Sequence, residues 1–316
     1  MPTKHHPHRG SMQFWPRARS SKSTARVNTW NTSKEDKVEG FLGYKVGMTH
    51  LLFKEKNSKS PRHDMNVFCP CTVIECPPMK VYSIRFYKEI GYGPKVVSEI
   101  FSKKVDKELS RKVKVSKKDN KEPEDYDYFR LVVYTQPKLM GMGKKKPDMV
   151  EVGITDNLDY AKSLLDKEVK ISDVHKEGTW VDVHGVTTGK GFSGVVKKFG
   201  VKVMSHKAEK TKRGIGTMGA WTTKKVQYTV AQPGKFGYHL RTEYNKLCLK
   251  IGDKPEEINP KGGFVKYGLV KNDYLLIHGS VVGPTTRPIT ITSAIRPKKK
   301  AQAKEINYVS LESKQR

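Results

Sequence analysis

Hydrophobic and polar positions alternate in short runs along most of this chain, and alternation with a period of two is typical of β-strands. The runs are rich in β-branched and aromatic residues and are separated by Gly, Pro and Asp. They predict strands at residues 71–76, 79–87, 129–137, 149–154, 169–174, 179–186, 226–230, 247–251, 264–270, 273–282 and 287–295. Residues 40–53 are expected to form a strand, a turn and a second strand, because glycines punctuate this run. Many short strands joined by turns predict a mainly β fold with a closed antiparallel β-barrel.

Residues 88–168 differ from the rest of the chain. They contain the mixed-charge run KKVDKELSRKVKVSKKDNKEPEDYD at 103–127, two of the predicted strands, and a short helical pattern at 157–167 with Asn157 as a plausible N-cap. We interpret this region as an α+β insertion into a β core formed by residues 39–87 and 169–295. A basic N-terminal arm (1–38), a central loop extension within the core (187–225) and a C-terminal tail (296–316) complete the expected organisation.

The arm and the central loop are basic and lack a regular period. Residues 1–34 hold seven Lys or Arg and no acid, with Phe14, Trp15 and Trp30 among them. Residues 185–225 hold ten Lys or Arg and one acid, with Trp221 near the end of the loop. Such segments bury too little apolar surface to order themselves. Flat rings among basic residues suit contact with RNA bases and phosphates, and the alternative is a flexible surface loop open to proteolysis.

The composition supports a nucleic-acid partner. The 316 residues include 61 Lys and Arg against 32 Asp and Glu, a formal net charge of +29. A net charge of this size gives information about binding partners rather than about the fold. It favours a protein that binds a polyanion over a soluble enzyme that is merely basic. No run of eighteen apolar residues is present, and the basic N-terminus is not followed by an apolar segment, so neither a membrane span nor a secretory signal is expected.

Motifs of catalysis or metal binding are weak. Gly189, Gly191 and Gly194 form G-x-G-x-x-G, but an antiparallel β fold does not provide the βαβ unit that a dinucleotide site requires. The glycines are better explained by a tight backbone turn, followed by a short helical pattern. Three of the four cysteines lie in CPCTVIEC, whose spacing is not that of a zinc site, so we expect small buried thiols and no metal. No catalytic cluster and no cofactor are predicted.

Several long motifs resemble one family. FLGYKVGMT (41–49), GKGFSGVVKKFGV (189–201), GAW (219–221), GYHLRTEYNK (237–246) and GGFVKYGLVKNDYLLIHGSV (262–281) resemble the universal large-subunit ribosomal protein L-three family. HRGSMQFWPRAR (8–19) is similar to the N-terminal arm of its archaeal and eukaryotic members. The length of the C-terminus favours an archaeal origin.

The resemblance implies a translation-protein-type β-barrel, and binding to the large-subunit ribosomal RNA near its 3′ end early in assembly. It also implies a central loop that reaches toward the peptidyl transferase centre, with Trp221 at the loop tip. The expected partners are this RNA and neighbouring ribosomal proteins in cytoplasmic ribosomes, without a membrane and without a homo-oligomer. The alternative is an RNA-modifying or RNA-processing enzyme on a basic barrel.

The residues expected to contact ribosomal RNA lie in the arm, the loop and the motif GYHLRTEYNK. They are Arg9, Arg17, Arg19, Arg26, Lys190, Lys197, Lys198, Lys207, Lys210, Lys212, Arg213, Trp221, Lys224, Lys225, His239 and Arg241.

Overall fold

The chain folds into two compact units, each built from segments distant in the sequence. The computed structural model describes residues 10–31, 35–115, 121–208, 210–297 and 304–312. Met1–Ser21 and Thr187–Leu240 form the first unit, here called the basic unit, and Lys22–Val186 and Arg241–Arg316 form the second, here called the core unit. Arg9 lies outside the described residues.

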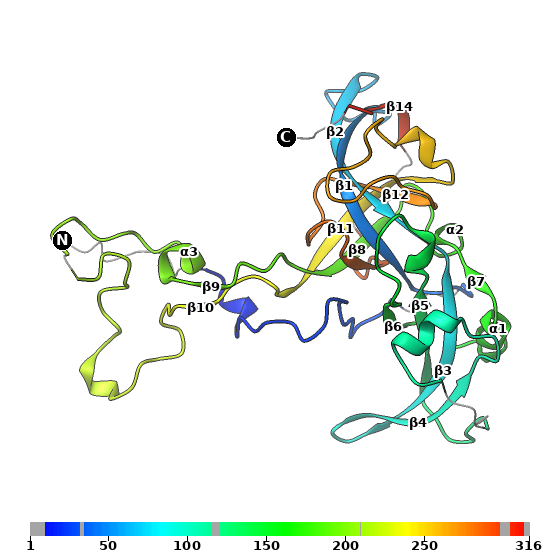
Figure 1. Cartoon of the computed structure of the whole chain (residues 1–316), viewed down its shortest axis with the longest axis horizontal. Coiled ribbons are helices and arrows are strands. Elements are labelled where there is room, and N and C mark those ends of the chain that lie inside the picture. Colours follow the sequence, from blue (N-terminus) through cyan, green and yellow to red (C-terminus); the bar gives the residue numbers. More distant parts are fainter. Residues whose placement is uncertain (1–9, 32–34, 116–120, 209, 298–303, 313–316) are drawn as a thin grey trace. The chain divides into compact units, whose positions relative to one another are not determined.

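The core unit contains a ring of paired strands, and Figure 1 labels all of these strands except β13. Within the described residues, six strands pair in the order β13, β8, β11, β12, β2, β1, and β1 pairs again with β13. Their bounds are β1 (Gly40–Lys54), β2 (Asn66–Glu75), β8 (Trp180–Val186), β11 (Leu240–Gly252), β12 (Tyr274–His278) and β13 (Pro288–Ser293). The strand β14 (Glu305–Val309) pairs with the second half of β1. The prediction of a mainly antiparallel β fold is confirmed.

The first strand of the ring is continuous, so the turn predicted within residues 40–53 is wrong. Its glycines allow close packing instead of chain reversal. A Cβ on Gly43 would lie 2.4 Å from Cγ2 of Ile74, and one on Gly47 would lie 3.1 Å from the ring of Phe264. A register shift between Lys45 and Gly47 absorbs the local irregularity without ending the strand.

A second antiparallel sheet extends the core unit. It has the order β4 (Gly93–Phe101), β3 (Met79–Ile90), β5 (Tyr128–Thr135) and β6 (Met149–Val152), and β7 (Glu168–Val169) also pairs with β3. Buried side chains of both sheets, including Phe41, Ile84, Leu131 and Ile291, belong to one hydrophobic cluster. The burial of such aliphatic and aromatic side chains, about 1.5–3 kcal/mol each, favours the folded state.

Short helices lie between these strands. The core unit has α1 (Leu158–Leu164) and α2 (Ile171–Val174), and single 3₁₀ turns at η2 (Lys107–Arg111), η3 (Pro137–Leu139) and η5 (Pro255–Glu257). The helix predicted at 157–167 is present, and its predicted N-cap is confirmed: the side-chain oxygen of Asn157 accepts a hydrogen bond from the amide of Tyr160 at 3.1 Å. This cap satisfies one of the amide groups that the first helical turn leaves free.

The strand predicted at residues 169–174 is mostly wrong. Only Val169 belongs to a strand, and α2 follows. The amide of Lys170 donates to the carboxylate of Asp173 at 3.0 Å, which favours a helical turn at this point. Ile171 and Val174 are both buried, so the same β-branched residues face the core at helical spacing.

Two further predicted strands, at 226–230 and 264–270, are also absent from the described chain. Val226 and Tyr228 are largely exposed, and no neighbouring segment forms a ladder with them. In the second case Phe264 and Gly268 exchange backbone hydrogen bonds, with Lys266 and Gly268 at positive φ, so the segment closes into a tight loop. Alternation of residue types predicted strands here, but a strand also needs a partner.

The basic unit is small and mostly irregular. Its elements are η1 (Met12–Phe14), β9 (Phe192–Ser193), α3 (Val195–Phe199), η4 (Trp221–Thr223) and β10 (Gly234–Lys235). The helix expected after the glycine motif is α3, and it ends at Gly200, whose φ of 67° is the left-handed cap typical of helix C-termini.

Candidate RNA interface

Two antiparallel segments, 187–193 and 234–239, form a narrow ladder at the base of the central loop, here called the neck. β9 pairs with β10, and the amides of Lys190 and Phe236 donate to the carbonyls of Phe236 and Gly191. Gly237 has a φ of 74°, and a Cβ at this position would lie only 2.1 Å from the carbonyl oxygen of Thr188. The neck therefore requires glycine at position 237, both for its backbone conformation and for the close approach of the two segments.

The N-terminal arm is bound to the neck by His239. Nε2 of His239 accepts a hydrogen bond from the amide of Gly237 at 3.1 Å, and Nδ1 lies 2.8 Å from the carbonyl oxygen of Ala18. Because Nε2 accepts, a neutral imidazole carries its proton on Nδ1 and donates it to Ala18. The amide of Ser20 donates to the carbonyl of Tyr238 at 2.8 Å. Segments about 220 residues apart thus become neighbours.

Aromatic side chains of the arm and the loop pack together beside the neck. The ring of Trp15 lies 5.9 Å from Phe199 and 6.1 Å from Tyr228, measured between ring centroids. The guanidinium of Arg17 lies 4.3 Å from the centroid of the Phe199 ring and donates to the carbonyl of Lys198 at 3.1 Å. A guanidinium over an aromatic face is electrostatically favourable. Burial, and then the charge of Arg17, lower the pKa of Lys198.

These contacts correct part of the interpretation of the arm. The sequence predicted that Trp15 and Trp30 lie along RNA because the arm has no core of its own. Trp15 packs on the basic unit instead, and Trp30 packs against the hydrophobic cluster of the core unit. A Cβ on Gly40 or on Gly153 would lie within 2.7 Å of the Trp30 ring, so both glycines make room for it. The sequence did not show these contacts, because each tryptophan packs against residues that are distant in the chain.

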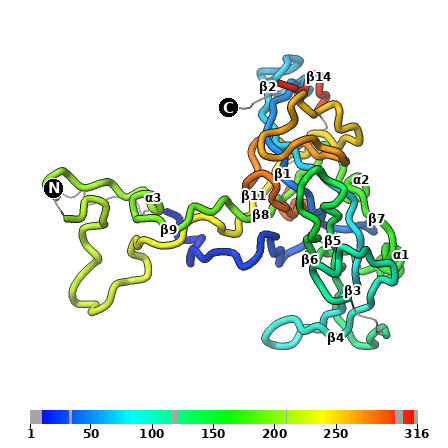
Figure 2. Tube along the Cα trace, in the orientation of Figure 1, coloured from blue at the N-terminus to red at the C-terminus, as the bar shows by residue number. Residues whose placement is uncertain are grey.

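The described residues of the loop from 201 to 233 have little regular structure, and Figure 2 traces the irregular course of this loop. Its described backbone hydrogen bonds are local, apart from one between the amide of Met204 and the carbonyl of Lys212. Trp221 is 95% exposed and lies in the 3₁₀ turn η4, which Lys224 ends with a φ of 51°. An indole so exposed is a large apolar surface available to another molecule.

Positive charge is concentrated in the basic unit. Met1–Ser21 and Thr187–Leu240 contain 15 of the 61 Lys and Arg residues but one of the 32 acidic residues. Nearly half of the net charge therefore belongs to less than a quarter of the chain. Most of these cations have no acidic neighbour in sequence, so a polyanion is the partner that neutralises them.

The described candidate residues fall into three groups. The exposed ones are Arg19, Arg26, Lys190, Lys197, Lys207, Lys210, Lys212, Arg213, Trp221, Lys224 and Lys225. Arg17, Lys198 and Arg241 are partly buried, and His239 is 5% exposed. All but Arg26 and Arg241 belong to the basic unit. Lys202, one of the ten cations counted at 185–225, and Lys235 are exposed in the same unit but were not among the candidate residues.

The remaining chemistry of the described chain is simple. All four cysteines are free and buried, as predicted, and burial raises the pKa of Cys69 to about 11. No group of three or more potential metal ligands occurs among the described residues. None of the helices in the described ranges is long and apolar enough to cross a membrane.

A ring of antiparallel strands together with an irregular, strongly basic extension and an exposed tryptophan fits the class of ribosomal proteins, and comparison with known proteins identifies the family. The family model described as Ribosomal protein L3 matches residues 1–126 and 119–316, and the chain belongs to this family. It is 44% identical to the large ribosomal subunit protein uL3 of Methanobrevibacter smithii, over 98% of both chains. Proteins of the same name from Methanosphaera stadtmanae and Methanocaldococcus jannaschii are each 42% identical over at least 97% of both chains.

Family membership confirms the resemblance seen in the sequence, and the similar proteins from methanogens agree with the predicted archaeal type. It also confirms that the chain is a structural ribosomal protein and not an enzyme.

Proposed function

We propose that this protein binds large-subunit ribosomal RNA near its 3′ end, nucleates early assembly of the subunit, and extends its central loop toward the peptidyl transferase centre. One observation carries the proposal: the exposed cations and Trp221 are collected in one unit, whose two segments the neck and His239 hold together. The ring of strands is proposed to be a translation-protein-type barrel, with residues 88–168 as its α+β insertion.

The physical roles within this interface differ. Exposed lysines such as Lys210 and Lys212 neutralise phosphates and release condensed counterions, which supplies most of the affinity. Trp221 offers an aromatic face to a base or to a neighbouring surface. His239, which is buried, positions the arm rather than contacting RNA. Arg9, Arg26 and Arg241 remain proposed contacts. The proposed location is the cytoplasmic ribosome, with other ribosomal proteins as neighbours.

Sedimentation tests the proposal directly. The protein should be found with the large subunit at one copy per particle and should remain there in moderate salt. A substoichiometric protein that washes off the particle would overturn the proposal.

The salt dependence of binding provides a second test. For a protein that contacts many phosphates, the logarithm of the association constant falls linearly with the logarithm of salt concentration. We expect affinity for a fragment of large-subunit RNA to fall about a thousandfold or more between low and moderate salt. A nearly flat response would show that a few uncharged contacts dominate.

A further inference from the structure

Two phenylalanines of the neck have different surroundings. The ring of Phe236 is partly buried: Nζ of Lys190 lies 4.7 Å from its centroid, and the imidazole of His239 lies 6.5 Å away, measured between ring centroids. The side chain of Phe192, in contrast, is 78% exposed. A phenyl ring gains no hydrogen bond from water that would favour this exposure. Phe192 therefore presents an apolar ring, most of which the described chain leaves uncovered.

The ladder of the neck fixes the position of this ring. Phe192 lies in β9 and pairs with Lys235 of β10, and residues directly opposite each other in an antiparallel pair project to the same face. The next residue, Ser193, projects to the other face, where it is 6% exposed and its hydroxyl donates to the carbonyl of Lys190 at 3.4 Å. One face of the neck is therefore packed. The other, here called the open face, presents Phe192 beside the exposed Lys235.

The charges around the open face are positive. Lys235 lies opposite Phe192, and the ring of Phe236 holds the ammonium of Lys190 at the neck. The described residues of the basic unit include no acidic residue, and the one acid of this unit, Glu209, lies outside them. Cations without acidic partners in their own unit attract the phosphates of a nucleic acid. Exposed rings among such cations are the surfaces on which proteins stack unpaired bases.

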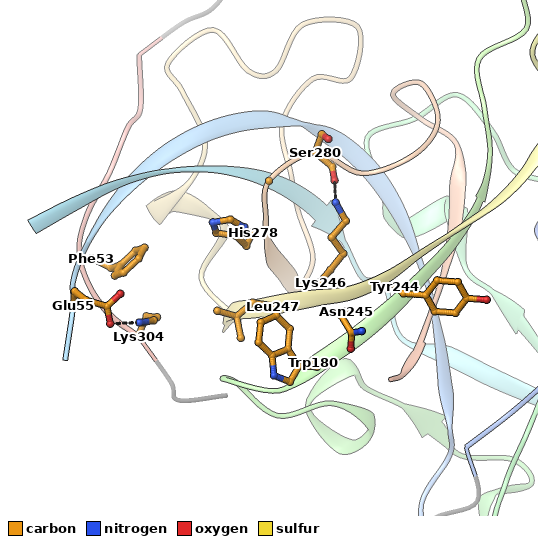
Figure 3. Close-up of a pocket in the computed structure, with 11 residues that line it drawn as sticks. Phe53, Glu55, Trp180, Tyr244, Asn245, Lys246, Leu247, His278, Ser280 and Lys304 are labelled. Atoms are coloured by element: carbon orange, nitrogen blue, oxygen red, sulfur yellow. Dashed lines mark hydrogen bonds and ion pairs between the residues drawn. The ribbon is translucent and has the colours of Figure 1, made fainter. Parts of the chain in front are cut away.

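A hollow in the core unit shows the opposite arrangement of charge (Figure 3). Nζ of Lys246 lies 3.1 Å from the carboxylate of Glu243 and donates to the carbonyl of Ser280 at 2.9 Å. Lys304 pairs with Glu55. The cations of the hollow are thus neutralised within the chain and give a phosphate no net attraction. An exposed ring and cations without acidic partners come together at the open face of the neck, not at the hollow.

The ring and the cation together favour a nucleotide over a protein surface. An apolar pocket that covered Phe192 would also draw Lys235 into an interface with little water, where an ammonium without a partner is unfavourable. A nucleotide supplies both groups that the open face can bind, a flat base for the ring and a phosphate for the ammonium.

We propose that the open face of the neck binds one unpaired base of ribosomal RNA, which stacks on the ring of Phe192 while Lys235 neutralises a phosphate beside it. A ring face forms no hydrogen bonds with base edges, so the site accepts any of the four bases. Neither residue belongs to the contacts proposed above for the arm and the loop. The inference rests on the proposed function, because it requires the chain to bind ribosomal RNA.

The salt dependence of affinity distinguishes a stacked base from a phosphate contact. The dissociation constant of the full chain for a fragment of large-subunit RNA is measured over a series of salt concentrations, for the wild type and for Phe192→Ala, Phe192→Tyr, Lys235→Ala and Tyr92→Ala. Tyr92 is the matched control, because it is 93% exposed but lies in the core unit.

We expect Phe192→Ala to weaken binding about 5- to 150-fold at every salt concentration, with an unchanged salt slope, because a stacking contact is lost but no phosphate contact. Phe192→Tyr keeps a ring and should restore the affinity. Lys235→Ala should reduce the slope of log affinity against log salt by about 0.7–1, the loss of one phosphate contact. Tyr92→Ala should change neither quantity.

The outcomes separate this inference from the proposed function. If the wild type binds the fragment and Phe192→Ala binds it equally well, the inference alone is wrong. It is also wrong if Phe192→Ala lowers the hydrogen-exchange protection of the Lys190 and Phe236 amides, since the ring would then be part of the packing of the neck. If the wild type does not bind large-subunit RNA at all, the proposed function itself fails.

Cross-linking in assembled subunits provides a second readout. A photoreactive benzoylphenylalanine replaces Phe192 and reports what lies against the ring. A cross-link to ribosomal RNA supports the proposal, whereas a cross-link to a neighbouring protein overturns it.

Discussion

Replacing Gly237 by alanine should open the neck of the basic unit, and Gly191→Ala is its matched control. Both glycines have positive φ, 74° and 66°, so both variants carry the cost of a left-handed alanine, about 1–2 kcal/mol. They differ in space: a Cβ on Gly191 meets nothing within 4 Å, whereas one on Gly237 lies 2.1 Å from the carbonyl oxygen of Thr188. The backbone must shift to relieve that overlap, and this shift costs about 1–3 kcal/mol in addition.

Hydrogen–deuterium exchange of the free protein measures the difference. Alanine also restricts the unfolded chain, but equally in both variants, so this effect cancels in the comparison. The protection of the Lys190 and Phe236 amides should therefore fall about 5- to 150-fold further in Gly237→Ala than in Gly191→Ala. Amides of β2 and β12 should keep their protection, because the core unit has its own hydrophobic clusters. Equal losses in the two glycine variants would refute the close-approach argument.

Three other predictions follow from burial and charge. Trp221→Ala should leave the free energy of unfolding unchanged within about 0.5 kcal/mol, since the side chain is 95% exposed. It should also leave incorporation into subunits intact while altering peptide-bond formation or tRNA affinity; loss of incorporation would place the indole in the folding core. Replacing Lys210, Lys212 and Arg213 together by alanine should expose the loop to protease in assembled subunits. The same change at Lys95, Lys103 and Lys107, which are also exposed but lie in the core unit, should leave the protease sensitivity of the loop unchanged. Burial lowers the pKa of His175 to about 4. Between about pH 6.5 and pH 4, His175 therefore binds a proton in the unfolded chain but not in the folded chain. The free energy of unfolding should fall as pH falls through this window, by up to about 1.4 kcal/mol per pH unit. Urea unfolding at pH 7 and pH 5 measures the slope, which His175→Gln should lose and His63→Gln should keep.

The sequence predicted those parts of the fold that depend on local pattern. Strands at 79–87 and 179–186 and the Asn157 cap follow from residue types a few positions apart, and the structure has them. The errors arise where a distant partner decides. Val226 and Tyr228 alternate like a strand but pair with no strand among the residues that the structure describes, and Gly43 leaves the space that Ile74 occupies.

In the candidate interface, too, the sequence predicted what depends on local residue types and did not predict what depends on distant partners. Charge and glycine content located the basic segments, because these properties belong to each residue by itself. They did not indicate that Trp15 packs on Phe199, or that His239 is buried and binds Ala18, because those contacts join segments far apart in the chain.

The closure of the strand ring constrains the order in which the protein can fold during its synthesis. β1 is complete once residue 54 has been synthesised, but β13, which joins it to β8, ends at Ser293. During translation, the first half of β1 therefore keeps an unpaired edge while more than two hundred further residues emerge, and such edges invite pairing with other chains. Pairings between neighbouring segments, such as β1 with β2 and β3 with β5, can form early, since loop closure is cheapest over short separations. A nascent chain truncated before residue 288 should consequently depend on chaperones to stay soluble.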